Sequence, residues 1–238
     1  MTIKKCLSVI LFIFIGFNAL AQNATNSLEL ANEISHDRET IRRDALFANT
    51  TVAGNPYLNR NFQDGRLIDK NGSKSPVIPL RYNIYSGYIE YKAPDNKVYT
   101  LKHKDSKIKN YVIHDTTFIY SSFHRTKNKI VSGYFQVLVP GKATGLIKYT
   151  VDLLEAQPTR PYKPAQPEHF SRMIYNFYVK TGNNAAVPVP RNKDFLQLFP
   201  KQKRRLSQYI KKEKIHIRKQ VDFVKLVNYY NFLAGSEN

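Results

Sequence analysis

The stretch LRYNIYSGYIEYK, residues 80–92, carries a tyrosine at every third position, namely Tyr82, Tyr85, Tyr88 and Tyr91. A strand repeats every two residues and a helix every 3.6, so a period of three fits neither element alone. A two-residue turn at Ser86-Gly87 removes the conflict, because glycine adopts the positive φ angle that tight hairpin turns need. The stretch is then two strands of period two, joined by a turn.

A hairpin centred on this turn separates apolar from polar side chains. Directly opposed residues share a face of a sheet, and this turn predicts that Ile84 lies opposite Ile89 and Tyr82 opposite Tyr91. One face would then pack on a core, while the polar face would meet solvent. The apolar face comprises Leu80, Tyr82, Ile84, Ile89, Tyr91 and Ala93, and the polar face comprises Arg81, Asn83, Tyr85, Tyr88, Glu90 and Lys92.

Further short runs of β-branched and aromatic residues, separated by turn residues, lie on both sides of the hairpin. We expect an antiparallel β-meander over residues 52–156, forming a sandwich or an open barrel-like sheet. Since helical patterns follow later, the predicted fold class is α+β. The strand-like runs are RLID at 66–69, KVYTLKH at 97–103, KNYVIHD at 109–115, TTFIYSSF at 116–123, GYFQVLV at 133–139 and GLIKYTVDLLEA at 145–156.

A proline-rich linker, residues 157–169, follows the predicted meander. Its prolines are spaced by three, at Pro158, Pro161, Pro164 and Pro167, which is the period of polyproline II. Such a strap could be a peptide ligand for an aromatic groove, but a stiff connector lying across the sheet is the simpler interpretation. A β-hairpin is predicted next, over residues 170–190, and its two late prolines restrict the second strand to a sheet edge.

Helical periodicity predicts a basic helical C-terminal region over residues 191–238. Phe195, Leu198 and Phe199 stand at helical spacing, and Pro200 suits the first turn of a following helix. Residues 219–234 place apolar side chains along one stripe, which is typical of an amphipathic helix.

The first residues predict export. Lys4 and Lys5 precede an apolar run, LSVILFIFIGF, and an A-x-A motif ends at Ala21, so residues 1–21 have the order of a secretory signal peptide. We expect residence in the periplasm or outer envelope after cleavage at about Ala21, with residues 22–51 as a polar N-terminal tether. No later run is apolar over the roughly 18 residues that a membrane span needs, so no transmembrane span is expected.

The chain is strongly basic, with 37 lysines and arginines against 18 aspartates and glutamates and a formal net charge of +19. Residues 201–219, KQKRRLSQYIKKEKIHIRK, hold nine of these basic residues and one acid, Glu213. Positive charge of this density attracts lipid headgroups, acidic glycans and nucleic acid, although a solvated helix exterior has the same sequence pattern. The candidate contacts with an anion or partner are Lys201, Lys203, Arg204, Arg205, Lys211, Lys212 and Lys214, together with the polar-face aromatics Tyr85 and Tyr88.

The sequence shows no catalytic constellation. It has no G-x-S-x-G or H-E-x-x-H motif and no glycine-rich phosphate loop, and none of its six histidines has a partner at metal-ligand spacing. We therefore assign no catalytic, cofactor-binding or metal-binding residue, and we expect no cofactor.

Three parts of the chain carry a resemblance to known proteins: GNPYLNRNFQDGRLI with PLRYNIYSGYIEYK, SGYFQVLVPGK with YKPAQP, and LFPKQKRRLSQYIKKEKI with VKLVNYYNFL. Over most of residues 54–234 the chain resembles a family of uncharacterised exported proteins from Gram-negative envelopes. The resemblance implies periplasmic or outer-envelope residence, and it implies no activity.

These patterns favour a non-catalytic exported envelope protein, an interaction module for a protein partner or an anionic envelope surface. Two alternatives stay open. A periplasmic enzyme acting on glycan or phosphate esters would need a pocket with converging carboxylates or histidines. A nucleic-acid-binding protein, suggested by two basic helices joined by a short turn, would require that residues 1–21 be no signal peptide.

Overall fold

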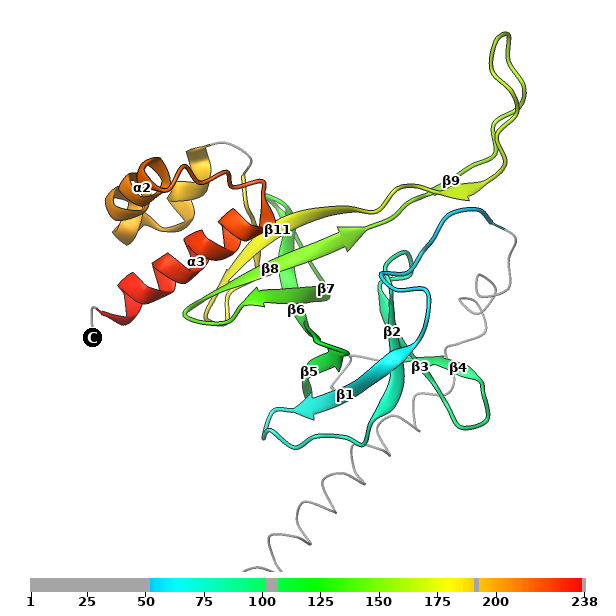
Figure 1. Ribbon diagram of the computed structural model, residues 1–238, viewed down its shortest axis with the longest axis horizontal. Helices are drawn as coiled ribbons and strands as arrows, with labels where there is room; N and C mark the ends of the chain where they lie inside the picture. Colours follow the sequence, from blue (N-terminus) through cyan, green and yellow to red (C-terminus); the bar gives the residue numbers. More distant parts are fainter. Residues whose placement is uncertain (1–51, 102–106, 191–192, 237–238) are drawn as a thin grey trace, which may run out of the picture.

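The computed structural model describes residues 52–101, 107–190 and 193–236 (Figure 1). An antiparallel sheet forms the body of the protein, and the C-terminal helices cover one end of it. The fold is therefore α+β with an antiparallel meander, as the sequence predicted. The predicted signal peptide and the predicted tether lie outside the described residues.

Ten strands form one sheet, in the order β12-β11-β8-β7-β6-β5-β1-β2-β3-β4. Every pairing between neighbouring strands is antiparallel. Most strands pair with their neighbour in sequence, and the main exception is β1, which lies between β2 and β5. The strands are β1 (Gln63–Asp69), β2 (Ile78–Asn83), β3 (Tyr88–Lys92), β4 (Val98–Thr100), β5 (Ile108–Ile113), β6 (Thr116–Thr126), β7 (Lys129–Val139), β8 (Ala143–Thr150), β11 (Ile174–Thr181) and β12 (Val187–Pro188).

The β2–β3 hairpin has the predicted faces but a different turn. Four residues, Ile84–Gly87, join the strands, and Tyr82 lies opposite Ile89 rather than Tyr91. The difference arises from a neighbouring segment. The amides of Ile84 and Tyr85 donate to the carbonyl of Pro56 (2.8 and 3.3 Å), so they do not form hydrogen bonds between β2 and β3. The register is displaced by two residues, which keeps every side chain on its face. All six residues of the predicted apolar face are buried.

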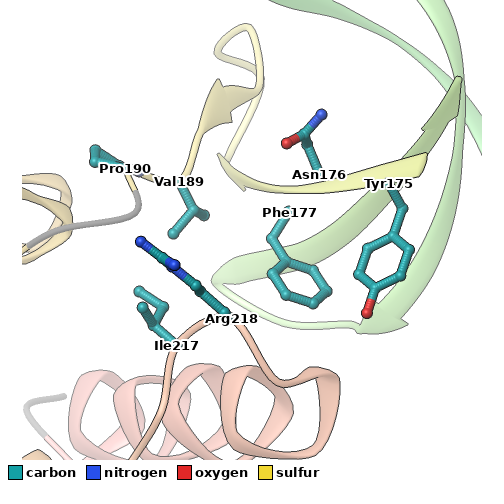
Figure 2. A pocket seen from close by; sticks show the side chains of 7 residues that line it. All are labelled: Tyr175, Asn176, Phe177, Val189, Pro190, Ile217 and Arg218. Carbon is teal, nitrogen blue, oxygen red and sulfur yellow. The ribbon is translucent and has the colours of Figure 1, made fainter.

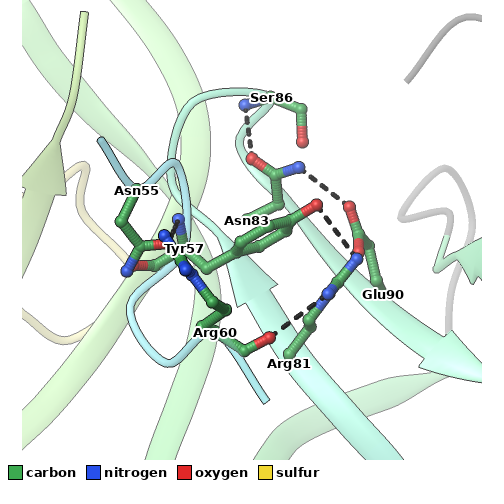
Figure 3. Close-up of polar contacts among 7 residues, drawn as sticks. All are labelled: Asn55, Tyr57, Arg60, Arg81, Asn83, Ser86 and Glu90. Carbon is green, nitrogen blue, oxygen red and sulfur yellow. Dashed lines mark hydrogen bonds and ion pairs between the residues drawn. The ribbon is translucent and has the colours of Figure 1, made fainter. Parts of the chain in front are cut away.

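The prediction that the other face of this hairpin meets solvent is wrong for its central residues. Arg81, Asn83 and Glu90 are buried, because the segment before β1 folds over them and lays Tyr57 against Arg81 (Figure 3). The sheet is therefore covered on both sides at this point.

Side chains of this segment and of the strands beneath it form the Arg81–Glu90 cluster, which comprises Tyr57, Phe62, Arg81, Asn83 and Glu90. Arg81 Nε donates to Glu90 Oε2 (2.7 Å) and Arg81 Nη2 to the Tyr57 hydroxyl (2.9 Å), while Asn83 Nδ2 donates to Glu90 Oε1 (2.8 Å). The guanidinium carbon lies 3.8 Å from the ring centre of Tyr57 and 4.3 Å from that of Phe62. Because each polar group finds a partner, the ion pair can be buried without an unsatisfied charge.

Apolar side chains gather in three cores along the sheet. The first lies under β1 to β6 and includes Leu67, Tyr111 and Phe118. The second lies between β8, β11 and the helices, and the third is a small core enclosed by one end of the sheet.

The end of the sheet that carries β11 and β12 curls back towards β6. Ala186, which precedes β12, donates its amide hydrogen to the Ser122 carbonyl (2.8 Å) and accepts from the amide of His124 (3.0 Å). Strands β6, β7, β8, β11 and β12 thereby surround the third core, made of Phe123, Phe135, Leu146 and Ala186.

A two-stranded arm leaves the sheet between β8 and β11 (Figure 1). It begins with β9 (Leu153–Leu154) and β10 (His169–Phe170), and residues 154–168 are all exposed. The predicted strap across the sheet is therefore wrong, since segment 157–169 forms the outer part of this arm. The proline spacing is compatible with this hairpin. A proline has no amide hydrogen to donate, but the residue before each proline has one, and these preceding residues form the backbone hydrogen bonds across the arm. Gln157 pairs reciprocally with Gln166, and Arg160 with Lys163.

The C-terminal region consists of η3 (Lys193–Leu198), η4 (Pro200–Gln202), α2 (Lys203–Lys212) and α3 (Gln220–Gly235). The predictions of a helix over 219–234 and of Pro200 in a first helical turn are confirmed. α3 packs against β7 and β8, and its Phe223 stacks on Phe177 with ring centres 4.5 Å apart. Over the described ranges, no helix is at once long and apolar enough to cross a membrane.

Candidate functional site

The basic residues of segment 201–219 all lie exposed on the helical region, and we call them the basic layer. η4 and α2 carry six of them, and the loop between α2 and α3 carries the other three. The structure thus brings together the seven basic candidates from the sequence and adds two more. The basic layer comprises Lys201, Lys203, Arg204, Arg205, Lys211, Lys212, Lys214, Arg218 and Lys219.

An apolar stripe on the inner side of the helices orients this layer. Leu206 is fully buried, and Phe199 and Ile215 are buried beside it in the second core. Tyr209 of α2 stacks on Tyr229 of α3, with ring centres 4.0 Å apart and planes 16° from parallel. Since the inward positions are filled by apolar side chains, the cations are directed to solvent.

The charge of the basic layer is not neutralised by neighbouring acids in the described part of the chain. Two ion pairs form there, Arg81–Glu90 at 2.7 Å and Lys97–Asp95 at 3.4 Å, and neither includes a residue of the layer. The nearby carboxylate of Asp222 accepts the amide hydrogen of His216 (2.9 Å) instead. The layer therefore presents exposed positive charge that no described carboxylate pairs with.

The two aromatic candidates lie elsewhere. Tyr85 and Tyr88 sit at the β2–β3 turn and are 38% and 41% exposed. The Tyr85 ring contacts Phe170 at the base of the arm edge to face, at 5.3 Å between ring centres. Because the helical region lies at the other end of the sheet (Figure 1), these tyrosines do not belong to the same surface as the basic layer.

A pocket of about 200 Å³ lies where β11 meets the loop between α2 and α3 (Figure 2). Arg218 extends from that loop towards Val189, and the Phe177 ring stands beside it with the Tyr175 ring beyond. The side chain of Asn176 points away. No sequence pattern indicated this pocket, because its walls come from three separate segments. The converging side chains are Tyr175, Phe177, Val189, Pro190, Ile217 and Arg218.

A second hollow, of about 220 Å³, lies over β1 and β5 and bears on the enzyme alternative. Asp64, Arg66 and His114 line it. The hydrogen bond that links Asp64 to His114 runs between their backbones (2.8 Å), and within the described residues none joins their side chains. The hollow offers one carboxylate and one imidazole but no coupled acid and base.

Lys148 of β8 is a partly buried cation that was not predicted from the sequence. Its Nζ lies 5.0 and 5.1 Å from the ring centres of Phe123 and Phe135 and 3.5 Å from the carbonyl oxygen of Tyr134. Burial lowers the pKa of Lys148 from 10.5 to about 8. Gly133 provides the space, since a Cβ there would lie 2.9 Å from Nζ. The alternation of β8 could have indicated this position, because Lys148 lies two residues after the core residue Leu146 and so points to the same face of the sheet.

No cluster of three or more histidine, cysteine, aspartate or glutamate side chains suited to a metal ion occurs in the parts of the chain that the structure describes. No family model, curated protein or solved structure matches the chain. The basic layer and the pocket are therefore the features from which a function can be inferred.

Proposed function

We propose that this protein is a non-catalytic exported envelope protein that binds an anionic surface of the envelope through its basic layer. The observation that carries the proposal is the set of nine exposed cations in residues 201–219, none of them in an ion pair with a described residue. The predicted signal peptide supports an envelope ligand over genomic DNA, because export would separate the protein from the chromosome.

The expected energetics are those of several weak contacts. A lysine or arginine close to an anionic lipid surface contributes about 1 kcal/mol, and the attraction decays within a Debye length of about 8–10 Å. Four such cations would contribute about 4 kcal/mol, or roughly a thousandfold in affinity. Salt should therefore weaken binding steeply.

Vesicle co-sedimentation tests the proposal. The purified protein is titrated with vesicles containing phosphatidylglycerol, and with pure phosphatidylcholine vesicles, across a series of salt concentrations. One variant replaces Lys203, Arg204, Lys211 and Lys212 with glutamine. The matched control replaces four exposed lysines outside the helices, Lys92, Lys109, Lys127 and Lys129, and so loses the same charge.

We expect binding to the anionic vesicles alone, lost in the helical variant and largely kept in the control. Equal weakening of both variants would mean that net charge, and not this surface, drives binding. Binding that ignores salt, or capture by neutral vesicles, would contradict the proposal outright. A protein that binds an acidic polypeptide but no anionic vesicle would point to a protein partner instead.

A further inference from the structure

The walls of the pocket at Arg218 are held in place by packing. The Phe177 ring stacks on Phe223, with 12° between the planes, and the Tyr175 ring contacts Phe177 at 5.5 Å between centres. The amide of Val189 donates to the carbonyl of Phe177 (2.9 Å), which fixes the opposite wall to β11. The pocket is therefore formed before any ligand arrives, and binding would need little ordering of its aromatic side.

The charge at the mouth of the pocket is unbalanced. Arg218 is exposed, and among the described residues no carboxylate pairs with its guanidinium. Other surfaces of the protein bear many cations, but here a guanidinium stands beside fixed aromatic rings and aliphatic side chains. An arginine in such a setting recognises a carboxylate through paired N–H donors, while the apolar walls take up a hydrophobic body.

We propose that this pocket binds a small organic anion, a carboxylate attached to a single flat apolar ring, with the carboxylate on Arg218 and the ring against Phe177 and Val189. The volume sets the size of the ligand, because about 200 Å³ is less than the roughly 300–1,000 Å³ of pockets that hold drug-sized molecules. This site shares Arg218 with the basic layer. It differs from the proposed surface binding because it requires one arginine and an apolar wall rather than many cations.

The test uses phenylacetate as the probe and 2-phenylethanol as a neutral molecule of similar size. Binding is followed by chemical-shift changes in ¹H–¹⁵N spectra of the intact protein. Arg218→Gln removes the proposed carboxylate ligand. Lys214→Gln, which removes one exposed charge from the same loop, is the matched control. Val189→Phe fills the pocket while all charges remain.

We expect phenylacetate to shift the amides of residues 175–177, 189 and 217–219, and to bind at least about tenfold more weakly to Arg218→Gln, as the loss of a charge-assisted hydrogen bond requires. Lys214→Gln should bind as the unaltered protein does. Equal weakening in the two loop variants, equal binding of 2-phenylethanol, or shifts spread along α2 would each overturn the proposal. Vesicle binding is measured on the same variants and should be unchanged in Val189→Phe, so the two proposals can fail separately.

Discussion

Replacing Glu90 by glutamine removes one charge from the Arg81–Glu90 cluster with almost no change in size. The side chains of Arg81 and Glu90 are only 10% and 4% exposed, so water cannot replace the lost partner. Charge centres about 4 Å apart attract by about 4 kcal/mol at an effective dielectric constant of about 20. We expect Glu90→Gln to lower the free energy of unfolding by about 3–5 kcal/mol, the usual loss when one member of a buried pair is removed.

Urea unfolding followed by circular dichroism measures this loss. The exposed Glu155→Gln is the matched control and should change stability by less than about 0.5 kcal/mol. The double variant Arg81→Met with Glu90→Leu should recover at least half of the loss, because it leaves no unpaired charge. A loss below about 1 kcal/mol for Glu90→Gln, or a double variant no more stable than the single one, would refute the reasoning.

Three further predictions concern the sheet and the helices. Lys148→Met should stabilise the protein by about 2 kcal/mol at pH 7. The Lys148 ammonium loses its proton near pH 8 in the folded state and near pH 10.5 in the unfolded state. The free energy of unfolding of the unaltered protein therefore rises between these pH values, and the advantage of the variant shrinks. A difference between the two proteins that stays constant in urea unfolding from pH 7 to 10 would contradict this. Gly65→Ala should cost about 1–3 kcal/mol in thermal melts, because its Cβ would lie 2.6 Å from the Val112 carbonyl oxygen, whereas Gly235→Ala, which meets no neighbour, should be harmless. Phe223→Ala should cost about 3–5 kcal/mol in urea, since its ring is buried and stacked on Phe177, and an effect below about 1 kcal/mol would mean that α3 is not anchored there.

Local patterns were sufficient where the contacts are local. The alternation of LRYNIYSGYIEYK assigned both faces of the β2–β3 hairpin, and the stripe in residues 219–234 located α3. The turn was placed wrongly because its first amides bond to Pro56, almost thirty positions earlier in the chain. Turn propensities depend on the residues of the turn itself, so they cannot reveal a hydrogen-bond acceptor that lies far away in the sequence.

The remaining errors have the same origin. Arg81 and Glu90 were assigned to solvent because their own strands are half polar, and only the segment around Tyr57 buries them. The proline spacing was assigned to polyproline II, although the same spacing leaves pairing amides in the right places for a hairpin. The basic candidates, by contrast, were recognisable, because charge in one continuous segment needs no tertiary contact to be brought together.

The arm at residues 154–168 is exposed along its whole length and adds no side chain to any of the three cores. Its sequence is consequently free of the packing demands that constrain every neighbouring strand. Single substitutions of exposed side chains at its tip, where Tyr162 stands fully in solvent, should each change stability by no more than about 0.5 kcal/mol. The outer surface of the arm can therefore be altered while the scaffold beneath it stays the same.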